Sequence, residues 1–196
     1  MNWKEYCSIP SNRVPYDYLN VSFEECSLPI SIKEMMKIWL SLVGVKPPLF
    51  LTGVPGCGKT YLMYLLFKHL RNDNPNSTMY FRQSIRMFQE LLDEKQETQN
   101  FSDFKNKLCT CDYLFIDDVL SENLTERMGT EYFEIIDQRI HNKKTFIISS
   151  NVSMETFSNS IGERMKDRMK DRMKRVVPIG LPEKSFRGEI NHFDKI

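Results

Sequence analysis

The feature that most constrains the fold of this chain is one complete match to the phosphate-binding pattern G-x-x-x-x-G-K-[ST]. The matching residues are Gly53, Val54, Pro55, Gly56, Cys57, Gly58, Lys59 and Thr60. An apolar stretch, 48–52, precedes them and a leucine-rich segment with helical spacing, 59–71, follows, so the motif joins a predicted strand to a predicted helix. Glycines let backbone N–H groups converge on phosphate oxygens, and a helix N-terminus adds a positive dipole end. The motif therefore predicts a P-loop that binds a nucleoside triphosphate.

The side chains at the end of the motif predict the contacts of the triphosphate and of Mg²⁺. We expect Lys59 to reach the β and γ phosphates and the Thr60 hydroxyl to coordinate the metal. We also expect Tyr61, the next residue, to belong to the nucleotide-binding site. Cys57 stands at a position that contributes mainly its backbone, so we expect no catalytic thiol there. Hydrolysis of the bound triphosphate is the activity that this pattern favours.

Two acidic residues, Asp117 and Asp118, directly follow the apolar stretch 113–116. A carboxylate at the end of a buried strand near a P-loop can hold Mg²⁺, as in a Walker B site. We assign Asp117 to the metal, directly or through water, and Asp118 to orienting or deprotonating the attacking water. The alternative for Asp118 is that it caps the following turn.

Asn151 follows the next apolar stretch, 145–148, after two serines. In an open parallel sheet, ligands lie beyond the carboxyl ends of the strands, so Asn151 is placed to position a water at the γ-phosphate. An asparagine in a loop can instead form an Asx-turn or cap the helix after it, and the pattern alone leaves these alternatives open.

Strand-like and helix-like segments alternate from residue 48 onward, which is typical of a parallel sheet covered by helices on both faces. An α/β fold is therefore predicted. The expected strands are 48–52, 77–82, 113–116, 145–148 and 176–179. The expected helices are 31–43, 59–71, 84 to about 97, a short one over 101–108, a long one over 124–140, and a last one near 154–174. Residues 1–46 are expected to form an irregular N-terminal arm and lead helix, and residues 47–196 a P-loop core.

Composition excludes several classes of protein. The 27 basic residues nearly balance the 26 acidic ones, so the overall charge gives no general attraction to nucleic acid. No run approaches the roughly 20 apolar residues needed to span a bilayer, and no secretory signal begins the chain. The five cysteines have no zinc-site spacing, and their odd number favours free thiols in a reducing compartment. We expect a cytoplasmic protein without membrane contact.

Taken together, these elements resemble the AAA+ ATPases of the DnaC/DnaI helicase-loader and IstB transposition-helper group, over about residues 8 to 190. The P-loop and seven further segments carry the resemblance. They are Ile9-Pro10-Ser11-Asn12-Arg13 with Phe23-Glu24, Leu114-Phe115-Ile116-Asp117-Asp118, Ile135-Ile136-Asp137-Gln138-Arg139 with Ile147-Ile148-Ser149-Ser150-Asn151, the Gly-Glu-Arg box from Ile161 to Met169, and Ser185-Phe186-Arg187.

The resemblance implies a three-layer αβα core around a central parallel sheet, with little or no helical lid, and ATP as the nucleotide. It also implies that Asn151 is the sensor I residue and that Arg187 is a sensor II-like residue that binds the nucleotide. Arg168 would be the arginine finger, inserted into a neighbouring subunit's site, so that hydrolysis needs self-association. Loaders of this group carry a helicase-binding domain before the Ile-Pro segment, and none is expected before Ile9 here.

A small duplication leaves the finger assignment open. Met165-Lys166-Asp167-Arg168 is followed by an identical Met-Lys-Asp-Arg, which makes Arg172 almost as good a candidate as Arg168. The same residues also fit a solvated helix with i,i+3 charge pairs above a methionine seam. The resemblance favours Arg168.

The function that this reading predicts is an ATP-dependent helicase loader or loader-like remodeller in DNA replication. The expected partners are further copies of the chain in a ring or spiral, single-stranded DNA and a replicative hexameric helicase. Candidate DNA contacts are Arg82, Arg86, Lys105 and Lys107. The alternatives are an IstB-like transposition helper on duplex DNA, a nucleotide-dependent binding switch with little turnover, and a small-molecule phosphotransferase.

Overall fold

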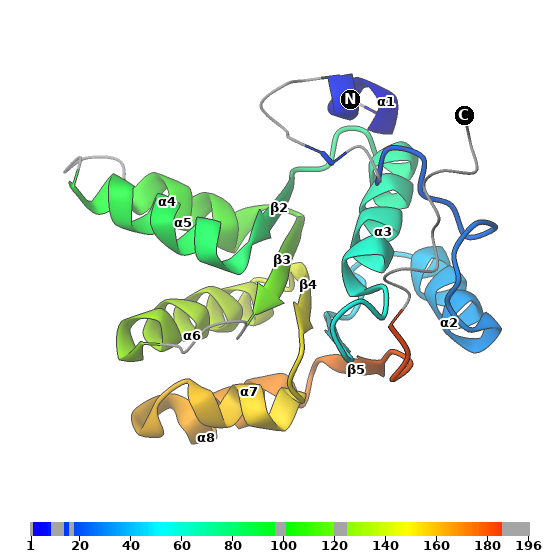
Figure 1. The fold of residues 1–196 in the computed structure, drawn as a ribbon. Coiled ribbons are helices and arrows are strands. Elements are labelled where there is room, and N and C mark those ends of the chain that lie inside the picture. The colour runs from blue at the N-terminus through cyan, green and yellow to red at the C-terminus, as the bar shows by residue number, and fades with distance from the viewer. Residues whose placement is uncertain (1, 9–13, 16–17, 97–100, 120–124, 186–196) are drawn as a thin grey trace.

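In a computed structural model of the chain, a five-stranded parallel sheet runs through the molecule (Figure 1). The structure describes residues 2–8, 14–15, 18–96, 101–119 and 125–185. The spatial order of the strands is β2-β3-β4-β1-β5. Their bounds are β1 Leu49–Thr52, β2 Met79–Gln83, β3 Tyr113–Val119, β4 Thr145–Ser150 and β5 Val177–Gly180. The predicted α/β class is confirmed.

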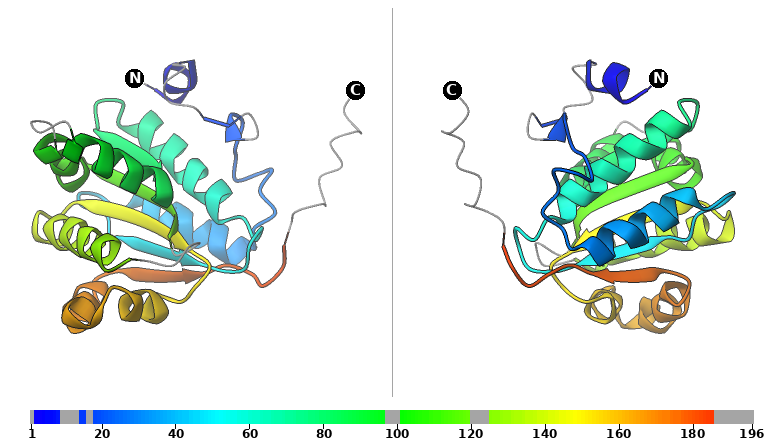
Figure 2. Two further views of the ribbon diagram at one scale, coloured as in Figure 1. Left: turned by 60° about the vertical axis from the view of Figure 1, so that its left-hand side comes forward. Right: turned by 90° about the vertical axis from the view of Figure 1, so that its right-hand side faces the viewer.

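Helices cover both faces of this sheet (Figures 1 and 2). One face carries α1 (Trp3–Ser8), α2 (Ile30–Ser41) and α3 (Lys59–Asp73), and the other carries α4 (Ser84–Gln96), α5 (Phe101–Thr110), α6 (Glu126–His141), α7 (Met154–Ser160) and α8 (Glu163–Met173).

Successive strand residues enter opposite layers of the core. Leu49 and Leu51 belong to the apolar cluster that contains α3, whereas Phe50 between them belongs to the cluster on the other face and packs against Phe157 of α7. The predicted three-layer αβα arrangement is confirmed. Within the described ranges, no helical lid follows β5, and no helix is long and apolar enough to cross a membrane.

The N-terminal arm differs from the irregular segment that we expected, because it begins with the short helix α1. Trp3 is buried, its indole N–H donates to the Leu19 carbonyl at 2.8 Å, and its ring packs edge-on against Phe67 of α3. Six residues are too few for a periodic pattern to reveal a helix. The arm shares one apolar cluster with α2, α3 and the sheet.

The last helix was expected to be continuous, but the structure divides it into α7 and α8. Gly162 separates them with a φ of 100°, a left-handed value that ends α7 and lets α8 start in a new direction. Ser153 caps the start of α7 by accepting a hydrogen bond from the Thr156 N–H. The methionine seam continues into α8, where Met169 and Met173 are buried.

Candidate nucleotide-binding site

The predicted P-loop lies between the end of β1 and the start of α3. Gly53, Gly56 and Gly58 all have positive φ values, of 153°, 84° and 97°. At Gly53 a Cβ would lie 2.6 Å from the Cys57 sulfur, so the loop closes on itself only because this residue has no side chain. Gly58 gives α3 no side-chain cap, which leaves the first N–H groups of the helix to bind phosphate oxygens.

Lys59 lies inside this loop. Only 7% of the residue is exposed, and its ammonium donates to the Gly53 carbonyl at 2.7 Å and to the Val54 carbonyl at 3.0 Å. A third hydrogen bond, of 2.7 Å, reaches Oδ1 of Asn151. The structure therefore brings together the P-loop lysine and the residue expected to position water, although they are 92 positions apart.

Thr60 and Asp117 meet next to the loop. The Thr60 hydroxyl donates to Oδ2 of Asp117 at 2.9 Å, and the carboxylate is buried at the end of β3. Burial raises the pKa of the Asp117 carboxyl, while hydrogen bonds from Ser149 and Thr60 act in the opposite direction. A hydroxyl and a carboxylate in contact form the oxygen pair that Mg²⁺ takes in P-loop proteins.

Asp118 and Asn151 also lie together, at the carboxyl ends of β3 and β4. The Asn151 amide donates to Oδ1 of Asp118 at 3.3 Å. Asn151 does not cap α7, because Ser153 does so. That leaves its side chain directed at Lys59 and Asp118.

Ser149 has a place in this site that the sequence analysis did not assign. It is fully buried, and its hydroxyl donates to Oδ1 of Asp117 at 2.5 Å and accepts the Asp118 N–H at 2.9 Å. The sequence does contain one signal for this role, a pair of serines at the end of an otherwise apolar strand. Because a buried hydroxyl needs a polar partner, such serines indicate polar contacts inside the protein.

Tyr61 points to the N-terminal arm. Its hydroxyl accepts the Ser22 N–H at 3.1 Å and donates to the Ser22 carbonyl at 3.2 Å. The side chain therefore ties the arm to α3. Arg187, predicted to contact the nucleotide, lies outside the described residues.

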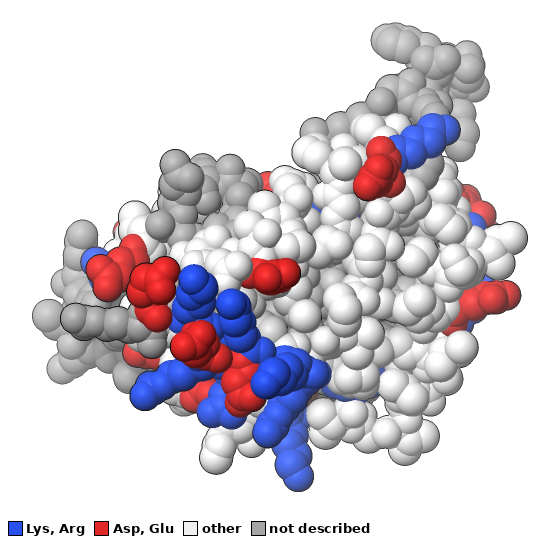
Figure 3. All heavy atoms as spheres, turned by 90° about the horizontal axis from the view of Figure 1, so that it is seen from below, with Lys and Arg blue, Asp and Glu red and all other residues white. Residues whose placement is uncertain are grey.

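Arg168 is not brought to this site within one chain. It is exposed on α8, whose buried methionines pack on the opposite face of the sheet from α3. Figure 3 views α7 and α8 from below and shows basic side chains gathered there with acidic ones between them. Arg172 donates to the Asp137 carboxylate of α6, whereas Arg168 has no hydrogen bond or ion pair within the described residues. The two arginines therefore differ in their contacts within the described residues, and the choice of Arg168 as the finger stays a prediction.

The four candidate DNA contacts also differ in whether they pair with a carboxylate of the same chain. Arg82 pairs with Glu90 at 2.9 Å, and Lys105 donates to Glu131 at 2.6 Å and to Glu134. Both cations are therefore already paired with carboxylates. Arg86 and Lys107 are exposed.

Comparisons with known proteins identify a family that the chain matches. The model of the bacterial DnaA ATPase domain matches residues 43–178. The chromosomal replication initiator protein DnaA of Lachnoclostridium phytofermentans is 32% identical over 105 residues, which cover 53% of this chain and 23% of that protein. The chain thus spans less than a quarter of that relative's length.

Solved structures share the fold at low identity. The DnaC helicase loader is 19% identical, with a TM-score of 0.73 over 86% of this chain and 100% of that one. A replication initiator DnaA bound to AMPPCP and single-stranded DNA is 20% identical, with a TM-score of 0.65 over 88% of this chain and 53% of that one. The predicted resemblance to AAA+ ATPases of the DnaC/DnaI type is confirmed.

Proposed function

The chain belongs to the family of the bacterial DnaA ATPase domain, and on that premise we propose that it hydrolyses ATP as a helicase loader or loader-like remodeller in DNA replication. One observation carries the proposal. Lys59, Thr60, Asp117, Asp118 and Asn151 converge at the carboxyl ends of β1, β3 and β4 and the start of α3. A turn that served only the fold would not require these five polar side chains in contact.

The residues present fit ATP and Mg²⁺. The uncapped N–H groups of α3 and the Lys59 ammonium would hold the phosphates, and Thr60 and Asp117 would hold the metal. When bound, Mg²⁺ neutralises charge on the β and γ phosphates. Asp118 would orient the attacking water or accept its proton, and Asn151, held between Lys59 and Asp118, would fix the position of that water.

The proposal includes self-association into a ring or spiral. Arg168 is exposed on a helix that covers the face of the sheet opposite the P-loop helix, which supports the proposal that it acts on a triphosphate bound by another subunit. An arginine supplied in trans stabilises charge on the transferring phosphoryl group.

Single-stranded DNA and a replicative hexameric helicase are the proposed partners. The DnaA structure bound to single-stranded DNA and the DnaC helicase loader share this fold, which supports the proposal by analogy. Arg86 and Lys107 are the two exposed candidate cations for a DNA backbone. Because these relatives act on DNA in replication, we also propose a cytoplasmic location.

The test is ATP turnover, with and without single- and double-stranded DNA, across a concentration range that permits assembly. We expect wild type to exceed Lys59→Ala by on the order of a hundredfold or more, since the ammonium is lost from the loop. Lys4→Ala, an exposed lysine on α1, is the matched control and should behave as wild type. Wild-type turnover no faster than that of Lys59→Ala would refute the proposal that the chain hydrolyses ATP.

The same experiment separates the alternatives. Stimulation by duplex rather than single-stranded DNA would favour a transposition helper, and tight ATP binding without turnover would favour a switch. A pull-down with the replicative helicase then tests the partner. Loss of the helicase on washing, under conditions where the chain binds ATP, would contradict helicase loading.

A further inference from the structure

The two acidic residues of the site lie at an irregularity in the sheet. The register between β3 and β4 runs Ile116 to Ile148 and then Val119 to Ser150. Two residues of β3, Asp117 and Asp118, therefore lie opposite one residue of β4, which is Ser149. Two residues opposing one is the definition of a β-bulge.

This bulge has a consequence for the direction of the two carboxylates. In a regular strand successive side chains point to opposite faces of the sheet, so two adjacent aspartates could not both face the P-loop. Here Asp117 contacts Thr60, and Asp118 contacts Asn151, which itself bonds Lys59. Asp118 adopts a φ of 60° to achieve this, a left-handed value that costs energy in a residue with a side chain.

The Ser149 side chain compensates for the interrupted ladder. Its hydroxyl oxygen accepts the Asp118 N–H at 2.9 Å, and its single hydrogen goes to Oδ1 of Asp117 at 2.5 Å. A hydroxyl has only one hydrogen to donate, so the direction of both bonds is fixed. One buried group thereby holds the backbone of one aspartate and the carboxylate of the other.

We infer that Ser149 is a positioning residue for ATP hydrolysis, which maintains the bulge and so aims Asp117 at the metal position and Asp118 at the attacking water. The inference rests on the proposed function. Ser149 acts through the two aspartates, because it is fully buried and its hydroxyl bonds to both of them. Binding of the phosphates by Lys59 and the loop N–H groups does not depend on it.

Ser150 provides a matched control one position away. It is equally buried, and its hydroxyl donates to the Val119 carbonyl at 2.6 Å and accepts the Val152 N–H at 3.2 Å. Its two partners are backbone groups, and neither belongs to the acidic pair. If both serines served only the fold, replacing either one with alanine would have the same effects on stability and on turnover.

The experiment compares Ser149→Ala with Ser150→Ala and wild type in four measurements. These are kcat, the Mg²⁺ concentration for half-maximal turnover, melting temperature, and binding of a fluorescent ATP analogue in EDTA and during Mg²⁺ titration. We expect Ser149→Ala to lower kcat by about 10- to 100-fold and to raise the Mg²⁺ requirement by about tenfold, because misplaced catalytic groups and lost outer-shell bonds have effects of this size. Binding of the analogue in EDTA should not change.

Ser150→Ala should lower the melting temperature as much as Ser149→Ala, yet keep the wild-type kcat and Mg²⁺ requirement. Ser149→Thr, which keeps the hydroxyl, should restore the Mg²⁺ requirement toward wild type. Ser149→Cys, nearly the same size but a weak donor, replaces the alanine variant if that one does not fold.

Two results would overturn the inference: unchanged kcat and Mg²⁺ dependence in Ser149→Ala, or the same kinetic defect in Ser150→Ala. A wild type no faster than Lys59→Ala would instead refute the proposed function. In that case the Mg²⁺-dependent part of analogue binding decides the role of Ser149, since it must be weakened in Ser149→Ala and intact in Ser150→Ala.

Discussion

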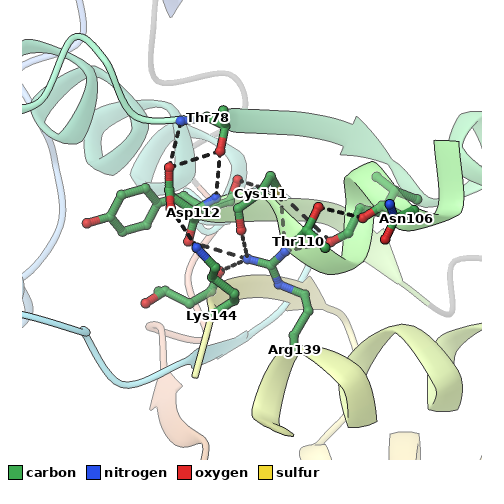
Figure 4. A network of polar contacts seen from close by, with 10 residues as sticks. Thr78, Asn106, Thr110, Cys111, Asp112, Arg139 and Lys144 are labelled. Carbon is green, nitrogen blue, oxygen red and sulfur yellow. Dashed lines mark hydrogen bonds and ion pairs between the residues drawn. The ribbon is translucent and has the colours of Figure 1, made fainter. Parts of the chain in front are cut away.

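Arg139 shows how a single buried cation joins three elements of this fold. Its guanidinium is fully buried and donates to the carbonyls of Leu108, Cys111 and Thr145, which connects α6 to the end of α5 and the start of β4 (Figure 4). Burial lowers the pKa of Arg139, although the neighbouring Cys111 favours the charged form. The planar fork of arginine donates from separate nitrogens in fixed directions and so reaches carbonyls of different elements, whereas a lysine ammonium donates from a single atom.

We predict that Arg139→Met destabilises the fold by about 3 kcal/mol, because the carbonyls are left buried without a donor. The free energy of unfolding, measured by urea denaturation, checks this. Arg175→Met is the control, since Arg175 is exposed and its loss should change stability by less than about 0.5 kcal/mol. A loss below about 1 kcal/mol in Arg139→Met would mean that water replaces the missing donors.

The residues of the candidate site differ in how far sequence alone could predict their contacts. Lys59, Thr60 and Asp117 belong to motifs whose spacing follows from strand ends and helix starts, and the structure places Thr60 in contact with Asp117 and Lys59 in contact with Asn151. Ser149 was not predictable in the same way, because its bonds depend on a bulge in the register of two strands. Register is a property of strand pairing, which one strand's sequence does not specify.

At the scale of whole elements, α6 lies unusually close to the junction of α7 and α8. Gly129 on α6 faces the Ile161 carbonyl, and a Cβ built at Gly129 would lie 2.4 Å from that oxygen. Ile161 is buried and precedes the turn at Gly162. The contact fixes the position of α8, the helix that carries Arg168.

We predict that Gly129→Ala destabilises the protein by about 2 kcal/mol, although alanine favours helices by about 1 kcal/mol over glycine. The reason is that backbone, not a flexible side chain, occupies the space. Thermal unfolding checks the loss of stability. Gly180→Ala, where a Cβ would meet nothing within 4 Å, should leave the melting temperature nearly unchanged. A Gly129→Ala protein as stable as wild type would show that α6 and α8 separate without cost.

Most elements were predictable because apolar stretches alternate with helical spacing, and the exceptions have local causes. The break between α7 and α8 was missed because the methionines of α8 have helical spacing and so favoured one long helix, although Gly162 forms a turn before them. Helix α1 was missed because its stability comes from Trp3 packing against α3, a contact between distant parts of the chain. Tertiary packing decides such short helices more than local propensity does.

At the scale of the molecule, the sheet separates the two halves of the proposed chemistry. The P-loop helix α3 covers one face, and α8 with Arg168 covers the other. A site completed by Arg168 therefore needs a neighbour that repeats the same contact around a ring or along a spiral. Arg172, in contrast, is held by Asp137 of its own chain.

We predict that Arg168→Ala lowers ATP turnover on the order of a thousandfold while ATP binding persists, because the lost charge acts only on the transferring phosphoryl group. Mixing Arg168→Ala with Lys59→Ala tests whether the arginine acts in trans. The first protein keeps its P-loop and the second keeps its arginine, so about a quarter of the interfaces in a random equal mixture are complete. Turnover should recover to roughly that fraction of the wild-type rate.

Arg172→Ala, which breaks a surface ion pair worth at most about 1 kcal/mol, should retain near-normal turnover. A mixture that stays inactive would place the arginine in cis or outside the reaction, and a defect confined to Arg172→Ala would transfer the finger to that residue.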